Sequence, residues 1–463
     1  MIHQQSFSDL RHKYRQGQLS PVDVTRSALQ HAERVASLTN AFALLDADRA
    51  LAAARRSERR WRDGLPVGDL DGMPMTIKEF AAVQGWPTRR GSLTTSADPA
   101  PESTVFVARL ESAGAVLLGK TRAPEFNWKG VTDSPGYGIT RNPWNPDLTP
   151  CGSSGGCAAA VASGVVRLSF GSDAGGSVRI PAAFSGILGL KPTFGLIPVV
   201  PFPSHFSNTA HVGPLGVSSA DLVEAMQVVG GSSARDWTSV SEDAEARAAG
   251  ESPIEDLRIG LLNMNRWRES VPMVRAGVDL VAEVLRAEGV QLREVDFDLG
   301  GASSVGRELY ELACAQIVRA IPAKDRHLLD PALVACAAAV GEPNLQGYSG
   351  LMQQRDAHGA ALAALFETLD VLLMPTVPVT AFGIGRNVPT DWPDPNWFSW
   401  NLYTPAFNAL HVPALSYPVW PAGAEMPVGV QFAARKLGDR RLLRLGAWLE
   451  RRIPIRLSPL AEG

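Results

Sequence analysis

The sequence predicts an α/β fold, and three observations carry that prediction. Stretches with the apolar spacing of amphipathic helices alternate along the chain with short apolar, partly β-branched runs that are typical of strands. Hydrophobic residues make up 45% and charged residues 20% of the 463 residues, so the chain can bury a large core and is too apolar to be disordered. No repeat period and no low-complexity tract divides it. We therefore expect a single domain over residues 1–463, with a peripheral helical portion.

The first sixty residues are expected to be helical, after which helices and strands alternate. Ser20 followed by Pro21 is typical of a helix start, and the Ala/Arg-rich stretch 45–61, which lacks Pro and Gly, predicts a second helix. The turn residues Asp71-Gly72 precede an apolar run that predicts a strand. The expected elements that follow are a strand over 73–78, a helix over 105–112 and a strand over 115–118.

Composition changes sharply at residues 150–198, where Gly, Ser and Ala dominate and charged residues are nearly absent. Such a stretch predicts buried backbone, with glycines where chain segments or a ligand approach closely. Residues 230–256 are polar and indicate a surface excursion. Further along, the sequence predicts strands over 257–262 and 371–374 and an amphipathic helix over 271–287.

Charge and cysteine content exclude several classes of protein. Lys and Arg number 44 against 47 Asp and Glu, and the net charge of −3 disfavours nucleic acid or an anionic membrane as a partner. The lack of any Cys-x-x-Cys pair indicates reduced thiols rather than a disulfide framework or a zinc site at Cys151, Cys157, Cys314 and Cys336. A polar N-terminus and the lack of a roughly 18-residue apolar run predict a cytoplasmic protein that does not cross a membrane.

Two common motif patterns are matched in a context that argues against them. Residues 114–121 fit the phosphate-loop pattern, but the four residues between the glycines are Ala-Val-Leu-Leu, which favour a buried strand over an exposed loop. Residues 152–156 fit the Gly-x-Ser-x-Gly turn of α/β-hydrolases, but the preceding residues 142–150 contain three prolines and cannot form the strand that this turn needs. The sequence thus disfavours both a nucleotide site and a Ser-His-Asp triad.

A lysine, two serines and several glycines stand in a pattern that resembles the amidase signature family. The pattern comprises Gly72-Met-Pro-Met-Thr-Ile-Lys78, Cys151-Gly-Ser-Ser-Gly-Gly156, Phe170-Gly-Ser-Asp-Ala-Gly-Gly-Ser-Val-Arg-Ile-Pro181 and Gly189-Leu-Lys-Pro-Thr193. The match is close over 72–197, which the resemblance marks as the catalytic signature core, and weaker echoes occur at 213–215, 370–376 and 427–431. Ser153 and Ser177 are 24 residues apart, which fits the spacing of the family's two catalytic serines. The resemblance implies an amidase-signature fold, with a central mixed β-sheet covered by helices on both faces.

The chemistry of these residue types is coherent by itself. A serine hydroxyl becomes a good nucleophile only when a base takes its proton, and no histidine lies in a recognisable catalytic context. A lysine acts as that base only if its surroundings lower its pKa from about 10.4. Lys78, at the end of an apolar strand and facing a charge-poor segment, meets this condition. The resemblance implies that Ser177 is the nucleophile, that Ser153 relays its proton to Lys78, and that the Gly152–Ser153 bond is cis.

Other residues of the signature segments are expected to support this chemistry. Backbone N–H groups suited to an oxyanion hole are offered by Ala174, Gly175, Gly176 and Ser177. Ser154 is expected to support the site by hydrogen bonding, and Asp173 and Arg179 either position the loop or form a structural ion pair or backbone cap. Cys151 and Cys157 stand where the family usually has small residues, and we expect both to be buried without a catalytic role.

The resemblance implies an amidase, a hydrolase that cleaves a carboxylic amide to acid and ammonia or amine through an acyl-Ser177 intermediate. One alternative is the glutaminase subunit of a tRNA-dependent amidotransferase, which needs a partner subunit. The Tyr/Arg-rich stretch that anchors glutamine in such subunits is not found between residues 300 and 400. The other alternative is a catalytically silent binding protein on the same fold, against which the retained Lys78, Ser153 and Ser177 argue. We expect no cofactor, no metal and a small-molecule amide as partner, with a homodimer as an option.

Aromatic residues in the pocket segments predict an apolar or aromatic acyl group for the substrate. By the resemblance, these segments include Phe126, Trp128 and Phe202, together with Trp397, Phe398 and Trp400. Each of these side chains has the alternative of filling the core, which is the more common use of large aromatics. Residues from about 230 to 360 are expected to form a more variable helical portion that contributes to the pocket.

Overall fold

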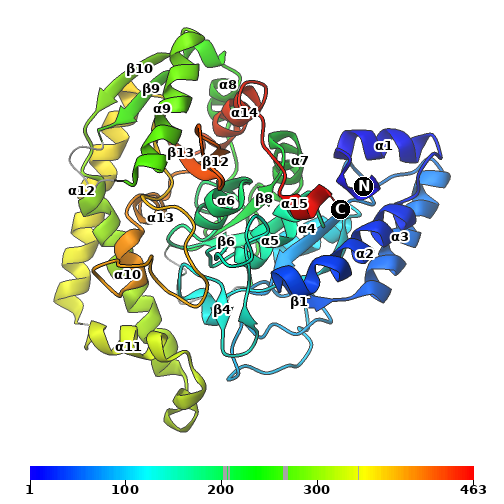
Figure 1. Ribbon diagram of the computed structural model, residues 1–463, viewed down its shortest axis with the longest axis horizontal. Helices are drawn as coiled ribbons and strands as arrows, with labels where there is room; N and C mark the ends of the chain where they lie inside the picture. Colours follow the sequence, from blue (N-terminus) through cyan, green and yellow to red (C-terminus); the bar gives the residue numbers. More distant parts are fainter. Residues whose placement is uncertain (202–205, 207–208, 264–269, 343, 463) are drawn as a thin grey trace.

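A computed structural model describes residues 1–201, 206, 209–263, 270–342 and 344–462. Eleven strands of this part of the chain form one mixed sheet at the centre of the fold (Figure 1). From edge to edge the strands are β1 (Phe42–Leu45), β3 (Val116–Thr121), β2 (Pro74–Lys78), β6 (Leu168–Asp173), β8 (His211–Gly216), β7 (Leu188–Lys191), β12 (Ala414–Val419), β13 (Val428–Ala434), β11 (Val371–Pro375), β9 (Arg258–Leu262) and β10 (Gln291–Val295). β2 runs parallel to β3 and β6, whereas β8, β12 and β13 are antiparallel to their neighbours. Two short strands, β4 (Asp133–Ser134) and β5 (Gly138–Ile139), pair separately.

Helices cover both faces of this sheet, as expected. They are α1 (Phe7–Arg15), α2 (Pro21–Thr39), α3 (Ala47–Arg62), α4 (Val105–Ser112), α5 (Gly155–Ala162), α6 (Arg179–Ser185), α7 (Ser219–Val229), α8 (Ala244–Gly250), α9 (Pro272–Ala287), α10 (Leu299–Ala320), α11 (Pro331–Val340), α12 (Leu345–Thr368), α13 (Pro405–Ala409), α14 (Asp439–Glu450) and α15 (Pro459–Glu462). Strand β3 shows how the two faces form. Val116 and Leu118 join the apolar cluster of α2 and α5, while Leu117, pointing the other way, joins the cluster of α4 and α7.

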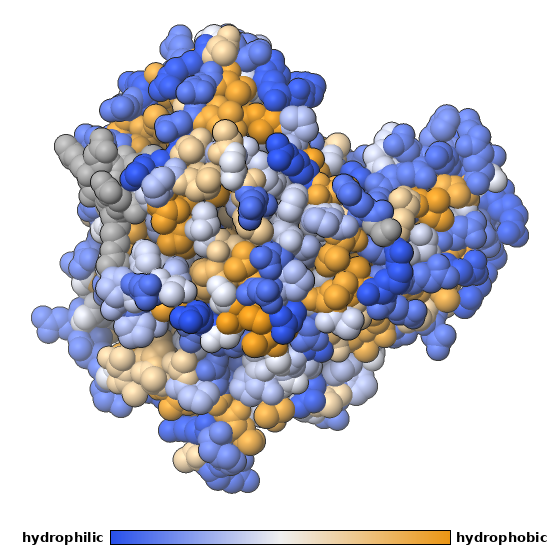
Figure 2. All heavy atoms as spheres, in the orientation of Figure 1, coloured by the Kyte–Doolittle hydropathy of each residue, from blue (hydrophilic) through white to orange (hydrophobic). Residues whose placement is uncertain are grey.

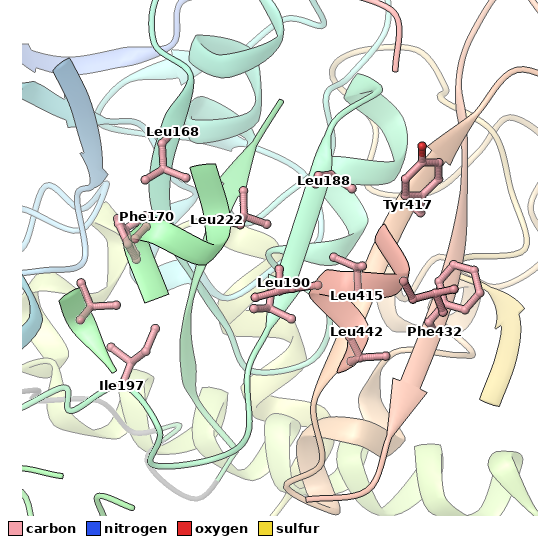
Figure 3. Packing of buried hydrophobic residues seen from close by; sticks show 14 of the residues in the cluster. Leu168, Phe170, Leu188, Leu190, Ile197, Leu222, Leu415, Tyr417, Phe432 and Leu442 are labelled. Atoms are coloured by element: carbon pink, nitrogen blue, oxygen red, sulfur yellow. The ribbon is translucent and has the colours of Figure 1, made fainter. Parts of the chain in front are cut away.

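The larger of these clusters fixes the strands that carry the site. Figure 3 shows side chains of β6, β7, β12 and β13 packed with side chains of α7 and α14. The labelled residues on these elements are buried: Leu168, Phe170, Leu188, Leu190, Leu222, Leu415, Tyr417, Phe432 and Leu442. Burying each such side chain contributes about 1.5–3 kcal/mol relative to leaving it exposed, so the middle of the sheet is a rigid support for the loops at its edge.

Most predicted elements are confirmed, with boundaries that agree to within three residues. Ser20 caps α2 by accepting a hydrogen bond from the Asp23 amide, with Pro21 as the first helical residue. The strand expected over 115–118 continues to Thr121 in β3. The segment that matches the phosphate-loop pattern is therefore a buried strand, and that nucleotide motif is excluded.

One expectation was wrong in part. The first sixty residues are not all helical, because β1 lies between Asn40, whose left-handed backbone (φ 50°) ends α2, and Asp46, which caps α3. Four residues are too few for a periodic signal, and pairing with β3 makes them a strand. The polar stretch 230–256 contains the helix α8, which packs on α14.

The surface is mixed in character. In Figure 2, hydrophilic residues dominate around the N-terminal helices at the right of the view, and apolar residues are scattered elsewhere. No helix in the described part of the chain is long and apolar enough to span a bilayer.

Candidate active site

The predicted lysine and serines lie near the carboxyl ends of two neighbouring strands inside the central sheet. β2 and β6 are adjacent parallel strands, so their carboxyl ends lie side by side. Lys78 is the last residue of β2, and Ser172 is the last but one of β6. Ser153 precedes α5 and follows the Gly152–Ser153 peptide bond, which is cis as expected. The strand ends and the start of α5 therefore converge on one point.

Lys78 is fully buried and faces hydroxyl groups. Its Nζ lies 2.7 Å from the Ser153 Oγ and 3.0 Å from the Ser172 Oγ. Burial lowers the pKa of Lys78 to about 7, although Cys157 and Asp173 act in the opposite direction. A substantial fraction of this lysine is therefore neutral near pH 7 and able to accept a proton.

The three serines of the site differ in their freedom. Ser153 and Ser154 are fully buried, whereas Ser177 keeps 4% of its surface exposed. The Ser154 hydroxyl donates to the carbonyl of Ser172 at 3.1 Å, and the Ser154 amide donates to the carbonyl of Ser177 at 3.1 Å. Within the described residues, the Ser177 hydroxyl is committed to no hydrogen bond. Ser154 thus bonds the backbone of both Ser172 and Ser177, and Ser177 is the one of these three serines that keeps exposed surface.

Asp173 and Arg179 form a buried ion pair that also shapes the loop between them. The Arg179 Nε and Nη2 donate to the two Asp173 oxygens at 3.0 Å each, and both side chains are fully buried. Burial alone would raise the pKa of Asp173, but the Arg179 guanidinium holds it well below its usual range. The same carboxylate accepts hydrogen bonds from the amides of Gly176 and Val178. The two alternatives for this pair, loop positioning and structural pairing, are therefore both realised.

The loop geometry corrects one expectation about the oxyanion hole. The Gly176 amide is not free, because it donates to the Asp173 Oδ1 at 2.7 Å. The amides of Ala174, Gly175 and Ser177 donate no hydrogen bond within the described residues. The number of available donors is smaller than the sequence run 174–177 predicts, because the side chain of Asp173 turns back onto its own loop.

Aromatic rings lie directly over this loop. A methyl group placed on Gly175 would lie 3.2 Å from the Phe398 Cζ and 3.5 Å from the Tyr310 Cδ2. Tyr310 packs edge-on against Phe398, with 5.2 Å between ring centroids, and donates a hydrogen bond to the carbonyl of Asn127 at 2.6 Å. Phe206 also packs against Tyr310, with 4.4 Å between the ring centroids. The loop is thus bounded by an apolar wall.

The other predicted pocket residues have different surroundings. Phe126 is half-buried and packs against the apolar cluster that contains Tyr310 and Phe398. Its backbone is left-handed (φ 50°). Trp128 is buried and donates its indole N–H to Asp330 at 3.1 Å. Trp397 and Trp400 are buried in the same cluster. Phe202 lies outside the described residues.

Cys151 and Cys157 are buried, as expected. Burial raises the pKa of both thiols, so neither is a thiolate near neutral pH.

Several residues that hold the site were missed by sequence reasoning. Ser172, whose hydroxyl is the second one bonded to the Lys78 Nζ, lies inside the matched Gly/Ser segment. Its place as a polar residue near the end of a strand is the signal that could have indicated it. Thr132 donates to the Cys151 carbonyl at 2.8 Å and accepts from the Gly155 amide at 3.0 Å. Asn401, Thr404 and Asn408 reach the loop from more than 220 residues away, and no local pattern announces them.

The chain is similar to known proteins over almost its whole length. The family described as Amidase matches residues 23–443. A Glutamyl-tRNA(Gln) amidotransferase subunit from Synechococcus sp. (strain WH7803) is 34% identical over 474 residues, which cover 96% of each chain.

Solved structures are similar over almost the whole chain. A bacterial aryl acylamidase of the amidase signature family superimposes with a TM-score of 0.88 at 27% identity, covering 98% of this chain and 97% of that one. A chain from a protein complex described as revealing the evolutionary origins of an s-triazine catabolic enzyme has a TM-score of 0.88 at 29% identity, with 98% and 100% coverage. The chain belongs to the amidase signature family.

Proposed function

We propose that this protein hydrolyses a carboxylic amide to an acid and ammonia or an amine, through an acyl ester on Ser177. The observation that carries the proposal is the buried contact of 2.7 Å between the Lys78 Nζ and the Ser153 Oγ, together with Ser177, which keeps 4% of its surface exposed. A dead homologue has no need to bury a lysine, whose desolvation is costly. The catalytic core in this proposal is residues 72–197.

The proposed reaction has two halves. The Ser177 Oγ attacks the amide carbon, its proton passes to Ser153, and the Ser153 proton passes to neutral Lys78. The amides of Gly175 and Ser177 stabilise the resulting oxyanion. As the C–N bond breaks, the proton returns from Lys78 through Ser153 to the leaving nitrogen. Water then attacks the ester by the same proton route, and the acid and free Ser177 are released.

The substrate class that fits the site is an amide with an apolar acyl group. The loop at Gly175 faces Phe398 and Tyr310. The nearby buried cation Lys129 is already paired with Asp133 at 2.5 Å and Asp330 at 2.9 Å. A zwitterion such as glutamine would lose hydration on entering this wall without gaining partners for its charges.

The second candidate is the glutaminase subunit of a tRNA-dependent amidotransferase. Similarity to a relative with an amidotransferase name at 34% identity supports it. With this function, the ammonia is delivered to a second subunit. The likeness to an aryl acylamidase, together with the apolar wall, supports the stand-alone amidase instead.

Steady-state ammonia release distinguishes these functions. The purified chain is assayed with glutamine, hexanamide and phenylacetamide, and with anilides by amine release, with Ser177→Ala as the blank. We expect the apolar amides to have the higher kcat/KM. A higher kcat/KM for glutamine, or stimulation by a co-purifying subunit, would establish the amidotransferase function. If no amide is turned over, the proposed hydrolysis is wrong and the chain is a catalytically silent binding protein.

A further inference from the structure

The carbonyl of Gly175 is held by two side chains from the C-terminal part of the chain. The Asn401 Nδ2 donates to this oxygen at 2.5 Å, and the Thr404 Oγ1 lies 2.7 Å from it. The Thr404 hydroxyl also lies 2.5 Å from the Asn401 Oδ1. Since this hydroxyl carries one proton, it donates to one of the two oxygens at a time, and the Asn401 amide keeps the carbonyl bonded in either case.

The other side of the same peptide is held as well. A peptide unit is planar, with its C=O and N–H pointing in opposite directions. The carbonyl of the Gly175–Gly176 unit faces Asn401 and Thr404, and its N–H donates to Asp173 at 2.7 Å. Both ends of this plane are therefore fixed by buried groups.

This arrangement requires glycine at position 176. Gly176 has a φ of 123°, in the region that side chains rarely adopt, and a Cβ there would lie 2.2 Å from the Thr404 Oγ1. The Thr404 hydroxyl thus occupies the space that a side chain would fill. The fit is mutual, because the glycine lets the hydroxyl approach and the hydroxyl orients the glycine peptide.

We propose that Asn401 and Thr404 are positioning residues for acyl transfer, which fix the Gly175–Gly176 peptide so that the amides on either side of it, those of Gly175 and Ser177, form the oxyanion hole. The inference rests on the proposed amide hydrolysis. Neither side chain has to touch the substrate. Their effect is on the direction of two N–H groups, whose stabilisation of a developing oxyanion depends steeply on geometry.

The segment that carries these residues is itself fixed to the loop. Asn408 donates to the backbone carbonyl and to the Oδ1 of Asp173, at 2.9 Å each. Arg179 donates to the Gln431 Oε1 on β13 at 2.7 Å. Residues 401–408 therefore contact the loop 173–176 at Asp173 and at Gly175, and Arg179 connects the same loop to β13.

The test uses Thr404→Val, which removes the hydroxyl at nearly constant volume, and Asn401→Ala. We expect kcat to fall by about 10- to 100-fold with little change in KM, since a misdirected donor lowers transition-state stabilisation more than substrate binding. Thr404→Ser keeps the hydroxyl and should restore most of the activity. Thr39→Val removes a buried hydroxyl that bonds the carbonyl of Val35 in α2, far along the chain from the site, and should leave kcat unchanged.

A transition-state mimic separates positioning from a merely structural role. The affinity of an apolar boronic acid, which adds to a serine to give a tetrahedral anion, should fall across the variants in proportion to kcat/KM, while binding of a planar ketone analogue that does not add to serine stays constant. Equal losses for both compounds, or wild-type kcat in folded Thr404→Val and Asn401→Ala, would overturn the clamp. Failure of the proposed function is seen separately, as a wild-type chain that turns over no amide.

Discussion

The side-chain nitrogen of Lys78 lies 2.7 Å from the hydroxyl oxygen of Ser153, and neither side chain has any exposed surface. A protonated lysine is costly in such a place, since both groups hydrogen-bonded to it are neutral hydroxyls. The enclosure that makes the charged form unfavourable is what makes the lysine available as a base.

The pH dependence of hydrolysis follows from this contact. Because burial lowers the pKa of Lys78 to about 7, kcat/KM should rise with pH on a limb centred near 7 and level off above it. Lys78→Ala should lower kcat by about 10²- to 10⁴-fold and remove that limb. A limb that persisted in Lys78→Ala would assign the base to another group.

The same lysine should leave a mark on stability. Its pKa is lower in the folded than in the unfolded chain, so between about pH 7 and 10.5 the unfolded chain binds more protons. The free energy of unfolding therefore increases as the pH rises through this range. Lys78→Met removes this contribution. The difference between wild type and Lys78→Met in urea titrations should change by up to about 1.4 kcal/mol per pH unit in this window. Parallel curves would show that Lys78 is not desolvated.

Ser153 and Ser154 should respond differently to truncation. Ser153→Ala interrupts the proton route and should lower kcat by about 10²-fold or more with little loss of stability. Ser154→Ala removes a hydrogen bond to the Ser172 carbonyl and should cost about 1 kcal/mol of stability with a smaller effect on kcat. Stopped assays and thermal unfolding of both variants measure these effects. A larger kcat loss in Ser154→Ala would reverse the roles.

The Asp173–Arg179 pair should be essential to folding. Asp173→Asn leaves the buried Arg179 without its counter-charge and should cost about 3–5 kcal/mol of stability. In the wild type, the lowered pKa of Asp173 contributes stability that is fully present above about pH 4 and is lost as pH falls below that value. Chemical denaturation at pH 7 measures the first effect, and acid titration the second. A loss within about 0.5 kcal/mol would mean that Arg179 finds other partners.

Short sequence motifs predict those parts of the site that depend on local backbone structure. The apolar run before Lys78 and the glycines around Ser153 and Ser177 specify a strand end and two tight loops, and the fold places them together because β2 and β6 are parallel neighbours. The bond from the Gly176 amide to Asp173 was not predictable, since it depends on a rotamer rather than on a residue pattern. The contacts of Asn401 and Thr404 depend on the path of the chain between β11 and β12, which no short motif records.

Trapping the acyl intermediate tests the role of Ser177 most directly. The chain is mixed with the p-nitrophenyl ester of an apolar acid, quenched in acid within the first turnover, and digested for mass spectrometry of the peptides that carry Ser153, Ser154 and Ser177. We expect the acyl group on Ser177 alone, at up to one equivalent, and none in Ser177→Ala. An acyl group on another residue, or release of nitrophenol without any acylated peptide, would contradict the proposed mechanism.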